Sequence, residues 1–235
     1  MSATSFGDLT VRQFLARLAS DSPTPGGGTG AAVAGALGAA LVRMLAMLTI
    51  GRPKFTSAEP LMKAVAESAR EAMEALTALA DEDARSYDAV SSAYRRPKAT
   101  EAEQAARKAA IEEAMKGACL APLKVMEQCL EVIGLAKNAV LQGNPNAASD
   151  GAAGAEFARA ALAVAAYNVR INLVSIEDEK FARDMRTRLD EMLYMGSTIA
   201  SEIDSRVQEM WKPKRPAGGI PPLPGASRPP AAPGA

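Results

Sequence analysis

Histidine is absent from the 235-residue sequence, and cysteine occurs only twice. Since histidine and cysteine are the usual ligands of zinc, we expect no structural or catalytic metal site. Cys119 and Cys129 are ten residues apart, which on one helix places them about 15 Å apart and on different faces, too far for a disulfide. Unpaired cysteines are typical of a reducing environment, so we expect a cytoplasmic protein.

Net charge is also absent, because 27 Lys and Arg residues balance 27 Asp and Glu residues. No overall field directs the protein towards nucleic acid or an acidic membrane surface, and we expect neither as a partner. The opening "MSATSFGDLTVRQF" lacks the basic start and the apolar run of a signal peptide.

Charge and composition change sharply after Trp211. Residues 212–235 carry 4 positive charges and no negative ones, which leaves a net charge of −4 on residues 1–211. The same segment holds 8 prolines and 4 glycines in 24 residues, a composition that sustains neither helix nor core packing. We therefore predict one helical domain over residues 1–211 and a disordered tail over residues 212–235.

Aromatic residues make up only 4% of the chain, and no stretch alternates apolar and polar residues over the length of a strand. Alanine, leucine, methionine, glutamate and arginine dominate, with short breaks between long periodic segments. This pattern predicts an all-α, single-domain antiparallel bundle of long helices. We expect the helices at residues 9–19 (capped by Asp8 or Thr10), 28–50, 59–94, 101–141, 147–176 and 178–211, with kinks at Pro122 and near Asp178.

The segment "PTPGGGTGAA" at the start of the second helix places three glycines before a long apolar stretch. Gly26, Gly28 and Ala31 fit the loose G-x-G-x-x-G/A dinucleotide pattern, but that motif needs a preceding strand, and a helix is expected there. No Gly-Lys-Ser/Thr follows, which excludes a Walker phosphate loop. The free backbone donors of the first turn can bind an anion or a flat ligand, or the glycines simply make a tight turn.

The apolar stretch itself has two interpretations. Ala31 to Ile50 is 20 residues, the length of a membrane span, but Arg43 lies in its middle and alanine and glycine are barely apolar enough to favour lipid. Gly35 and Ala39 illustrate a small-xxx-small spacing that lets helices approach closely. We therefore predict a buried helix packed against its neighbours or a second subunit.

Five segments together resemble a known family: "PTPGGGTGAA", "LADEDARSYDAV", "APLKVMEQCLEV", "GNPNAASDGAAGAEFARAAL" and "YNVRINL". In this order they are similar to the formiminotetrahydrofolate cyclodeaminase and methenyltetrahydrofolate cyclohydrolase family, over about residues 9 to 180. The resemblance implies an all-helical homodimer that binds a folate in a cleft partly built by the glycine loop. The tail after Trp211 has no counterpart in this pattern.

Members of that family either close 5-formiminotetrahydrofolate with loss of ammonia or hydrolyse the methenyl form to 10-formyltetrahydrofolate. A free-standing chain with "LTIGRPKF" and "NVRINL" resembles the cyclohydrolases of one-carbon metabolism, and we expect that activity. The alternatives are cyclodeaminase activity and a non-catalytic, folate-binding or scaffolding helical dimer. A tetrahydrofolate derivative is the expected substrate, with no further cofactor.

Three residues are candidates for catalysis. Without histidine, the base and the acid must be carboxylates, lysine, tyrosine or bound water. Asp83 in "DEDARSYD" is the first candidate for the base, because burial in a helical cleft would raise its pKa towards neutrality. The alternative is a solvated helix face on which Asp81 and Arg85 form an ordinary pair. Lys54 is a candidate acid that could instead contact the folate glutamate or orient water, and Asp150 is a second carboxylate. Their structural alternatives are a surface lysine and a helix cap.

The candidate substrate-binding residues are backbone, amide and guanidinium groups. Asn168 and Asn172 lie on one face of a very apolar helix, where unpaired amides are costly, so they contact either a ligand or another helix. Arg170 points away from that face by helix geometry. The full set is Gly26, Gly27, Gly28, Asn144, Asn146, Asn168, Arg170 and Asn172, and Asn144 and Asn146 could instead simply make a turn around Pro145.

Overall fold

The computed structural model describes residues 5–212, and this part of the chain is all-helical and contains no strand. Residues 213–235, nearly all of the predicted tail, lie outside the described residues. The helices are α1 (Val11–Leu18), α2 (Gly27–Met47), α3 (Glu59–Tyr94), α4 (Glu101–Ala118), α5 (Leu120–Gln142), α6 (Ala148–Leu173) and α7 (Glu179–Met210), with 3-10 turns η1 (Phe6–Asp8), η2 (Pro53–Ala58) and η3 (Pro145–Ala147).

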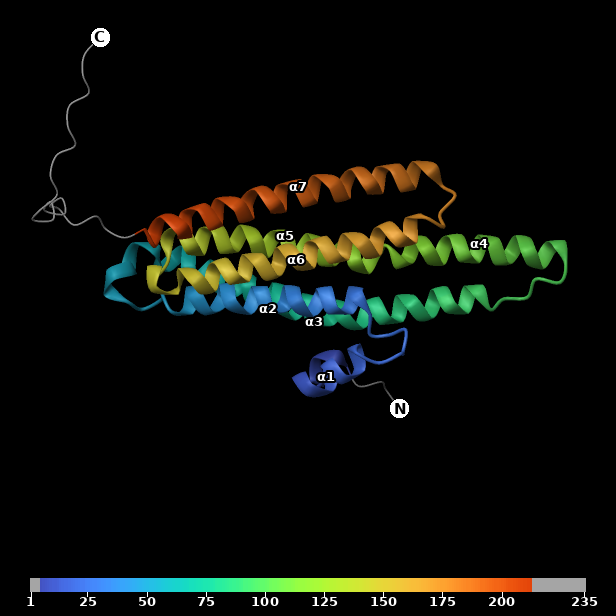
Figure 1. The fold of residues 1–235 in the computed structure, drawn as a ribbon, viewed down its shortest axis with the longest axis horizontal. Helices are drawn as coiled ribbons and strands as arrows, with labels where there is room; N and C mark the ends of the chain where they lie inside the picture. The colour runs from blue at the N-terminus through green and yellow to red at the C-terminus, as the bar shows by residue number, and fades with distance from the viewer. Residues whose placement is uncertain (1–4, 213–235) are drawn as a thin grey trace, which may run out of the picture.

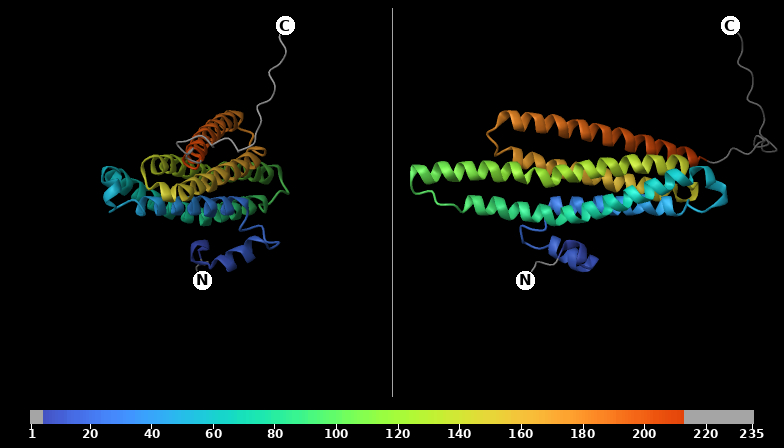
Figure 2. Two further views of the ribbon diagram at one scale, coloured as in Figure 1. Left: turned by 60° about the vertical axis from the view of Figure 1, so that its left-hand side comes forward. Right: turned by 180° about the vertical axis from the view of Figure 1, so that it is seen from behind.

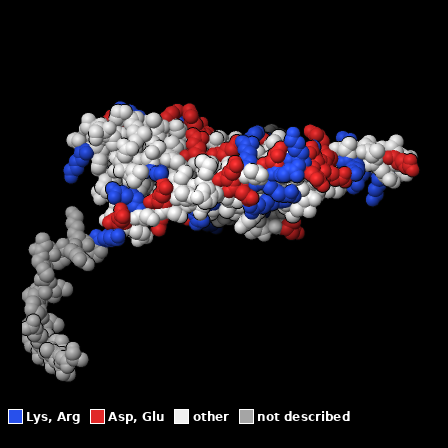
Figure 3. Space-filling model, turned by 90° about the horizontal axis from the view of Figure 1, so that it is seen from above, with Lys and Arg blue, Asp and Glu red and all other residues white. Residues whose placement is uncertain are grey.

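The long helices lie along one axis in stacked layers (Figure 1). Helices α2 and α3 form one layer, α5 and α6 pack over them, and α7 covers α5 and α6. The α2–α3 and α5–α6 connections lie at one end of the molecule, and the α3–α4 and α6–α7 connections lie at the other, as the view from behind also shows (Figure 2). Acidic and basic side chains are interspersed over the α7 side (Figure 3), which agrees with the balanced charge of the sequence.

Helix α2 is buried because its small residues let three neighbours approach its backbone. A Cβ atom at Gly38 would lie 2.7 Å from the Gly154 carbonyl oxygen of α6, and one at Gly35 would lie 2.8 Å from Cys129 Sγ of α5. By length and composition α2 is the one described helix that could cross a membrane, a test that the core helix of a bundle also passes. Its packing against α3, α5 and α6 confirms the predicted buried helix.

The predicted helix over residues 101–141 is divided at Cys119 into α4 and α5. Pro122 has no N–H to donate to the Ala118 carbonyl four residues earlier, so the helix cannot continue without a break. The freed Ala118 oxygen instead accepts a hydrogen bond of 3.0 Å from Asn172 Nδ2 on α6. The predicted kink is therefore confirmed, and the break lies at Cys119, three residues before Pro122.

Other boundaries differ by a few residues from the prediction. Helix α3 begins and ends as expected, whereas α2 ends at Met47 rather than Ile50, and α6 ends at Leu173 rather than Ile176. Asp178 caps α7 by accepting a hydrogen bond of 3.0 Å from the Phe181 amide. Thr10, one of the two predicted caps, begins α1 in a capping box with Gln13.

Helix α1 stands apart from the bundle and has no buried residue (Figure 1). The chain before it is tied to α3, because Ser5 Oγ and the Phe6 amide donate to the Asp81 carboxylate at 2.5 and 2.8 Å. Asp81 therefore does not form the surface pair with Arg85 that we considered from the sequence. Phe14 of α1 packs edge-on against the ring of Phe6, with the ring centres 6.3 Å apart, whereas Val11 and Leu15 remain exposed.

The glycine contacts of α2 generate a prediction about stability. Gly38→Ala is expected to destabilise the fold by about 1–3 kcal/mol, because the new methyl group meets the α6 backbone. Gly134→Ala in α5 is the matched control, since a Cβ there meets nothing within 4 Å, and we expect stabilisation by about 0.4–1 kcal/mol. Urea unfolding measures both, and equal shifts for the two variants would contradict the close α2–α6 packing.

A candidate active site at the start of helix α2

A pocket of about 320 Å³ lies where the glycine loop enters α2. Four segments meet there: the loop before α2, the second half of α3, the end of α4 and the second half of α6. We call it the Asp83 pocket; its lining residues are Pro23, Thr24, Gly26, Gly27, Gly28, Asp83, Ser86, Tyr87, Val90, Met115, Ala118, Asn168 and Asn172. The structure thus brings together six of the predicted site residues from three distant parts of the sequence.

The Asp83 carboxylate lies against the first turn of α2. Thr29 Oγ1 donates to Asp83 Oδ2 at 3.0 Å, and the Thr29 backbone also contributes a hydrogen bond. Because Gly26, the N-cap of α2, has no side chain to cap the helix, Asp83 supplies an acceptor from α3. A Cβ at Gly28 would lie 2.3 Å from Asp83 Oδ1, so only glycine allows the carboxylate to sit there.

The position of Asp83 changes its acidity. Burial raises the pKa of the carboxyl above its usual value, and the hydrogen bonds from Thr29 oppose this effect only in part. The raised pKa agrees with the direction expected from the sequence for a base in a helical cleft. Asp83 is also the only Asp, Glu, Lys or Arg among the residues that line the pocket, so the ionised carboxylate makes this pocket negative.

Asn168 and Asn172 face the pocket from successive turns of α6. Asn168 Nδ2 donates to the Val164 carbonyl at 2.8 Å, and Asn172 Nδ2 donates to the Ala118 carbonyl at 3.0 Å. Both amide nitrogens are thus held by backbone oxygens, which fixes the side chains in place. Within residues 5–212 neither amide oxygen accepts a hydrogen bond, so both are available to donors of a ligand.

Four predicted site residues lie at the opposite end of α2. Lys54, Asn144 and Asn146 help to line a separate pocket of about 580 Å³, which we call the Lys54 pocket, and Asp150 follows in the first turn of α6. The two ends of the 21-residue α2 are about 30 Å apart at 1.5 Å per residue. A single chain therefore does not bring these residues to Asp83.

Local contacts explain why those residues take other positions. Asn144 is buried in the turn before α6, where its Oδ1 accepts from the Asn146 amide at 3.1 Å and its Nδ2 donates to the Leu48 carbonyl at 3.3 Å. It makes the turn that we considered from the sequence. Asp150 is not a helix cap, because α6 begins at Ala148 and Asp150 lies within its first turn.

Arg170 lies outside the Asp83 pocket. Its Nη2 donates to Asp190 Oδ1 of α7 at 2.8 Å, on the opposite side of α6 from Asn168 and Asn172. This placement agrees with the helix geometry of the sequence and not with a shared ligand contact, so we correct the assignment of Arg170 to the same site.

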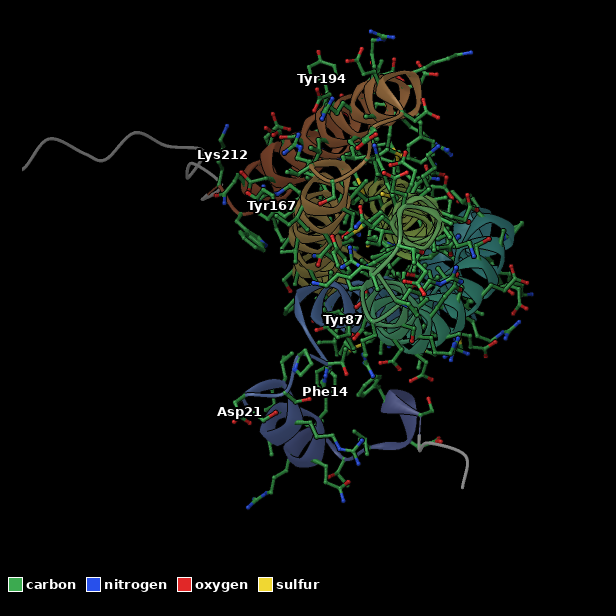
Figure 4. The ribbon with its side chains drawn as sticks, turned by 90° about the vertical axis from the view of Figure 1, so that its right-hand side faces the viewer. Phe14, Asp21, Tyr87, Tyr167, Tyr194 and Lys212 are labelled. Carbon is green, nitrogen blue, oxygen red and sulfur yellow. The ribbon has the colours of Figure 1, made fainter. Side chains whose placement is uncertain are left out.

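Sequence reasoning missed other residues of the pocket. Thr29 was passed over although it directly follows the glycines, and its hydroxyl holds the predicted base. Tyr87 lies one turn after Asp83 on α3, and its i,i+4 spacing could have placed it on the same face. Figure 4 shows Tyr87 beside the start of α2. Met115 comes from α4, and no local pattern links it to the glycine loop.

The buried carboxylate generates a prediction about stability and pH. Asp83→Asn is expected to raise the free energy of unfolding at neutral pH, because the amide accepts from Thr29 without carrying a buried charge. A raised pKa favours the folded state fully below the unfolded pKa, near 3.8, and this contribution is lost as pH rises through the folded pKa. In urea unfolding, the difference in free energy of unfolding between the variant and wild type should therefore increase as the pH rises through this range. A variant that is less stable than wild type at neutral pH would refute the argument.

The sequence is similar to proteins of one family. The chain is 40% identical over 208 residues to a methenyltetrahydrofolate cyclohydrolase of Methylorubrum extorquens, an alignment that covers 88% of this chain and 98% of the relative. It is 31% identical over 198 residues to the formimidoyltransferase-cyclodeaminase of Sus scrofa, covering 84% of this chain and 37% of that protein.

A solved structure shares the fold. The crystal structure of formiminotetrahydrofolate cyclodeaminase from Thermotoga maritima matches with a TM-score of 0.72 and 30% identity, covering 86% of this chain and 96% of the other. The sequence profile described as formiminotransferase-cyclodeaminase matches residues 10–191, a range that contains the glycine loop, Asp83 and both asparagines of α6. The chain therefore belongs to the formiminotransferase-cyclodeaminase family.

Proposed function

We propose that the protein hydrolyses 5,10-methenyltetrahydrofolate to 10-formyltetrahydrofolate. The observation that carries this proposal is the 40% identity to a methenyltetrahydrofolate cyclohydrolase that is matched over 98% of its length. The vertebrate cyclodeaminase relative is matched over only 37% of its length, so it contains a large region that this chain does not match.

The charge of the Asp83 pocket suits this substrate. The methenyl bridge carries a positive charge shared between N5 and N10, and the one charged lining residue is the Asp83 carboxylate. A partly buried carboxylate attracts a cation more strongly than one in bulk water does. The glycine loop leaves room for a flat pterin beside the first turn of α2, and the free oxygens of Asn168 and Asn172 accept hydrogen bonds from its ring N–H and amino groups.

Asp83 acts first as a base and then as an acid. Its carboxylate takes a proton from water while the water oxygen bonds to the bridging carbon, which becomes tetrahedral. The C–N5 bond then breaks, its electron pair goes to N5, and protonated Asp83 returns the proton to N5. The remaining hydroxyl loses its proton to solvent and becomes the formyl oxygen on N10. The raised pKa shifts the carboxyl in the direction that both steps require, since a group that takes up and returns a proton works best with a pKa closer to neutrality.

Cyclodeaminase activity is the second candidate, favoured by the similarity to the Thermotoga maritima cyclodeaminase structure. Both reactions pass through a tetrahedral carbon between two nitrogens, so one pocket can serve either. Loss of the methenyl absorbance above the spontaneous rate supports the cyclohydrolase. Ammonia release from 5-formiminotetrahydrofolate without methenyl hydrolysis supports the cyclodeaminase, and absence of both activities favours a non-catalytic folate-binding dimer.

Asp83→Asn is expected to lower kcat for methenyl hydrolysis by about 100-fold, because one positioned acid–base group contributes about that factor. The matched control is Asp88→Asn, an exposed carboxylate five residues along α3 that is not among the residues lining the pocket. Its turnover should equal that of wild type. Unchanged turnover in Asp83→Asn would remove Asp83 from the mechanism.

We also propose that the antiparallel helices form a homodimer through α2 and α6. These two helices lie side by side, and an apolar stripe follows their outer face at helical spacing. We call it the α2–α6 face; its exposed or partly exposed residues are Leu37 and Met44 of α2, Phe157, Val164, Tyr167 and Ile171 of α6, and Val174 directly after α6. Tyr167 projects outward from α6 in Figure 4. An apolar stripe of this length is typical of a protein interface.

A two-fold axis across the middle of this face would assign a role to the Lys54 pocket. Such an axis reverses α2, so the start of α2 in one copy meets its end in the other. Lys54, Asn146 and Asp150 of one copy then approach the Asp83 pocket of its partner. We retain these residues in the proposed site only if this dimer forms.

We also propose that the enzyme works in the cytoplasm, where Cys119 and Cys129 stay reduced.

Ile171→Asp is expected to convert the dimer to a monomer, because it places a charge within the apolar stripe, where Ile171 is 67% exposed in one chain. Tyr194→Asp on α7 is the control, since Tyr194 is also highly exposed, at 75%, but lies outside the α2–α6 face. Light scattering after size exclusion measures the mass of each. A monomeric wild type, or a dimer that survives Ile171→Asp, would reject this interface.

A further inference from the structure

The hydroxyl of Thr29 has a different partner from those of the other α-helical threonines in residues 5–212. A threonine within a helix can donate its hydroxyl hydrogen to the carbonyl oxygen four residues earlier. Thr77 of α3 and Thr187 and Thr198 of α7 do so, at 2.8, 3.2 and 2.9 Å. Thr29 instead donates to Oδ2 of Asp83 on another helix, at 3.0 Å. The exception is the threonine that contacts the proposed base.

The position of Thr29 in the first turn of α2 explains this difference. Helix α2 begins at Gly27, so the residue four positions before Thr29 is Pro25, which precedes the helix. The first amides of a helix have no carbonyl partner within it, and the Thr29 amide contributes a second hydrogen bond to Asp83. One residue of α2 therefore directs two donors, a hydroxyl and a backbone amide, to the carboxylate of α3.

Thr29 contacts Asp83 from the buried side. Thr29 is 0% exposed and is not among the residues that line the Asp83 pocket, whereas Asp83 is. The hydroxyl therefore holds Oδ2 from behind the pocket wall. Oδ1 is the oxygen nearer to Gly28, a lining residue, since it lies 2.3 Å from the position of a Cβ there and Oδ2 lies 2.7 Å away. The contact with Thr29 thus fixes the orientation of the carboxyl relative to the pocket.

No other charged side chain lines the pocket in which Asp83 titrates. Tyr87 of α3 is the second titratable lining residue, and the loop before α2, α4 and α6 contribute none. The neighbouring carboxylates on α3 are engaged elsewhere, because Asp81 accepts from the η1 segment and Glu82 pairs with Lys124 of α5 at 2.8 Å. Two effects therefore act on the pKa of Asp83: burial raises it, and the hydrogen bonds from the start of α2 lower it.

We propose that Thr29 is a positioning residue of the reaction, whose hydroxyl keeps the Asp83 carboxyl ionised and correctly oriented without touching the substrate; this rests on the function proposed above. The first step needs an ionised carboxylate, which burial alone disfavours. Without the hydroxyl, the buried carboxyl would keep its proton to a higher pH, and Oδ2 would lose the donor that holds it. The proton itself moves between water, Asp83 and N5, so Thr29 neither takes nor gives one.

Thr29→Val tests the proposal, because valine lacks the hydroxyl and has nearly the shape of threonine. The pH dependence of kcat/KM for methenyl hydrolysis reports the pKa of the base in the free enzyme. We expect the acid limb of this profile to move to higher pH by about one unit, the effect of one hydrogen bond to a charged acceptor. Above that limb the KM should equal that of wild type, since Thr29 does not line the pocket.

Thr29→Ser, which keeps the hydroxyl, should retain the wild-type profile. A Thr29→Val profile that coincides with that of wild type, with hydrolysis intact, overturns the role of Thr29 and leaves the proposed function standing.

Two further variants separate positioning from a general effect on the fold. Thr77→Val is the matched control, because it removes the hydroxyl of a partly buried threonine on α3 that donates to the Met73 carbonyl. Its profile should match that of wild type. In Asp83→Asn, adding Thr29→Val should not lower kcat further, because Thr29 acts through the carboxyl. An equal shift in Thr77→Val, or additive losses in the double variant, would contradict the assignment.

A direct titration covers the case in which the protein does not hydrolyse the methenyl form. NMR of isotope-labelled aspartate carboxyl carbons follows Asp83, whose signal is identified by its loss in Asp83→Asn. The midpoint should rise in Thr29→Val and in Thr29→Ala, which adds no atom to the core, and should stay at the wild-type pH in Thr29→Ser. A raised midpoint without hydrolysis supports the contact and rejects the proposed reaction. An unchanged midpoint in both variants rejects the role of Thr29.

Discussion

The absence of a side chain at three glycines of α2 is the constraint on which the fold and the site both depend. Gly35 and Gly38 bring α5 and α6 against its backbone, where any Cβ would meet atoms closer than 3 Å. The same condition holds at Gly28, where the neighbour is the Asp83 carboxylate instead of a helix. The missing Cβ at these glycines therefore allows close helix packing along α2 and leaves room for a polar pocket at its first turn.

Asp83 occupies a position where packing and chemistry oppose each other. Burial of its carboxyl raises the pKa, whereas the Thr29 hydroxyl and the free amides at the start of α2 favour the ionised form. A residue selected only as a helix cap would gain nothing from that burial. The cost in folding free energy is explained if the carboxyl must both accept and return a proton within one turnover.

Periodicity within single helices was predictable from the sequence, and contacts between distant helices were not. The spacing of apolar residues located α3, Pro122 marked the α4–α5 break, and helix geometry separated Arg170 from Asn168. Helix spacing defines which residues share a face but not which neighbour covers that face. The order in which the helices stack places Thr29 against Asp83. It also leaves Lys54 at the other end of the 21-residue α2, far from these two residues.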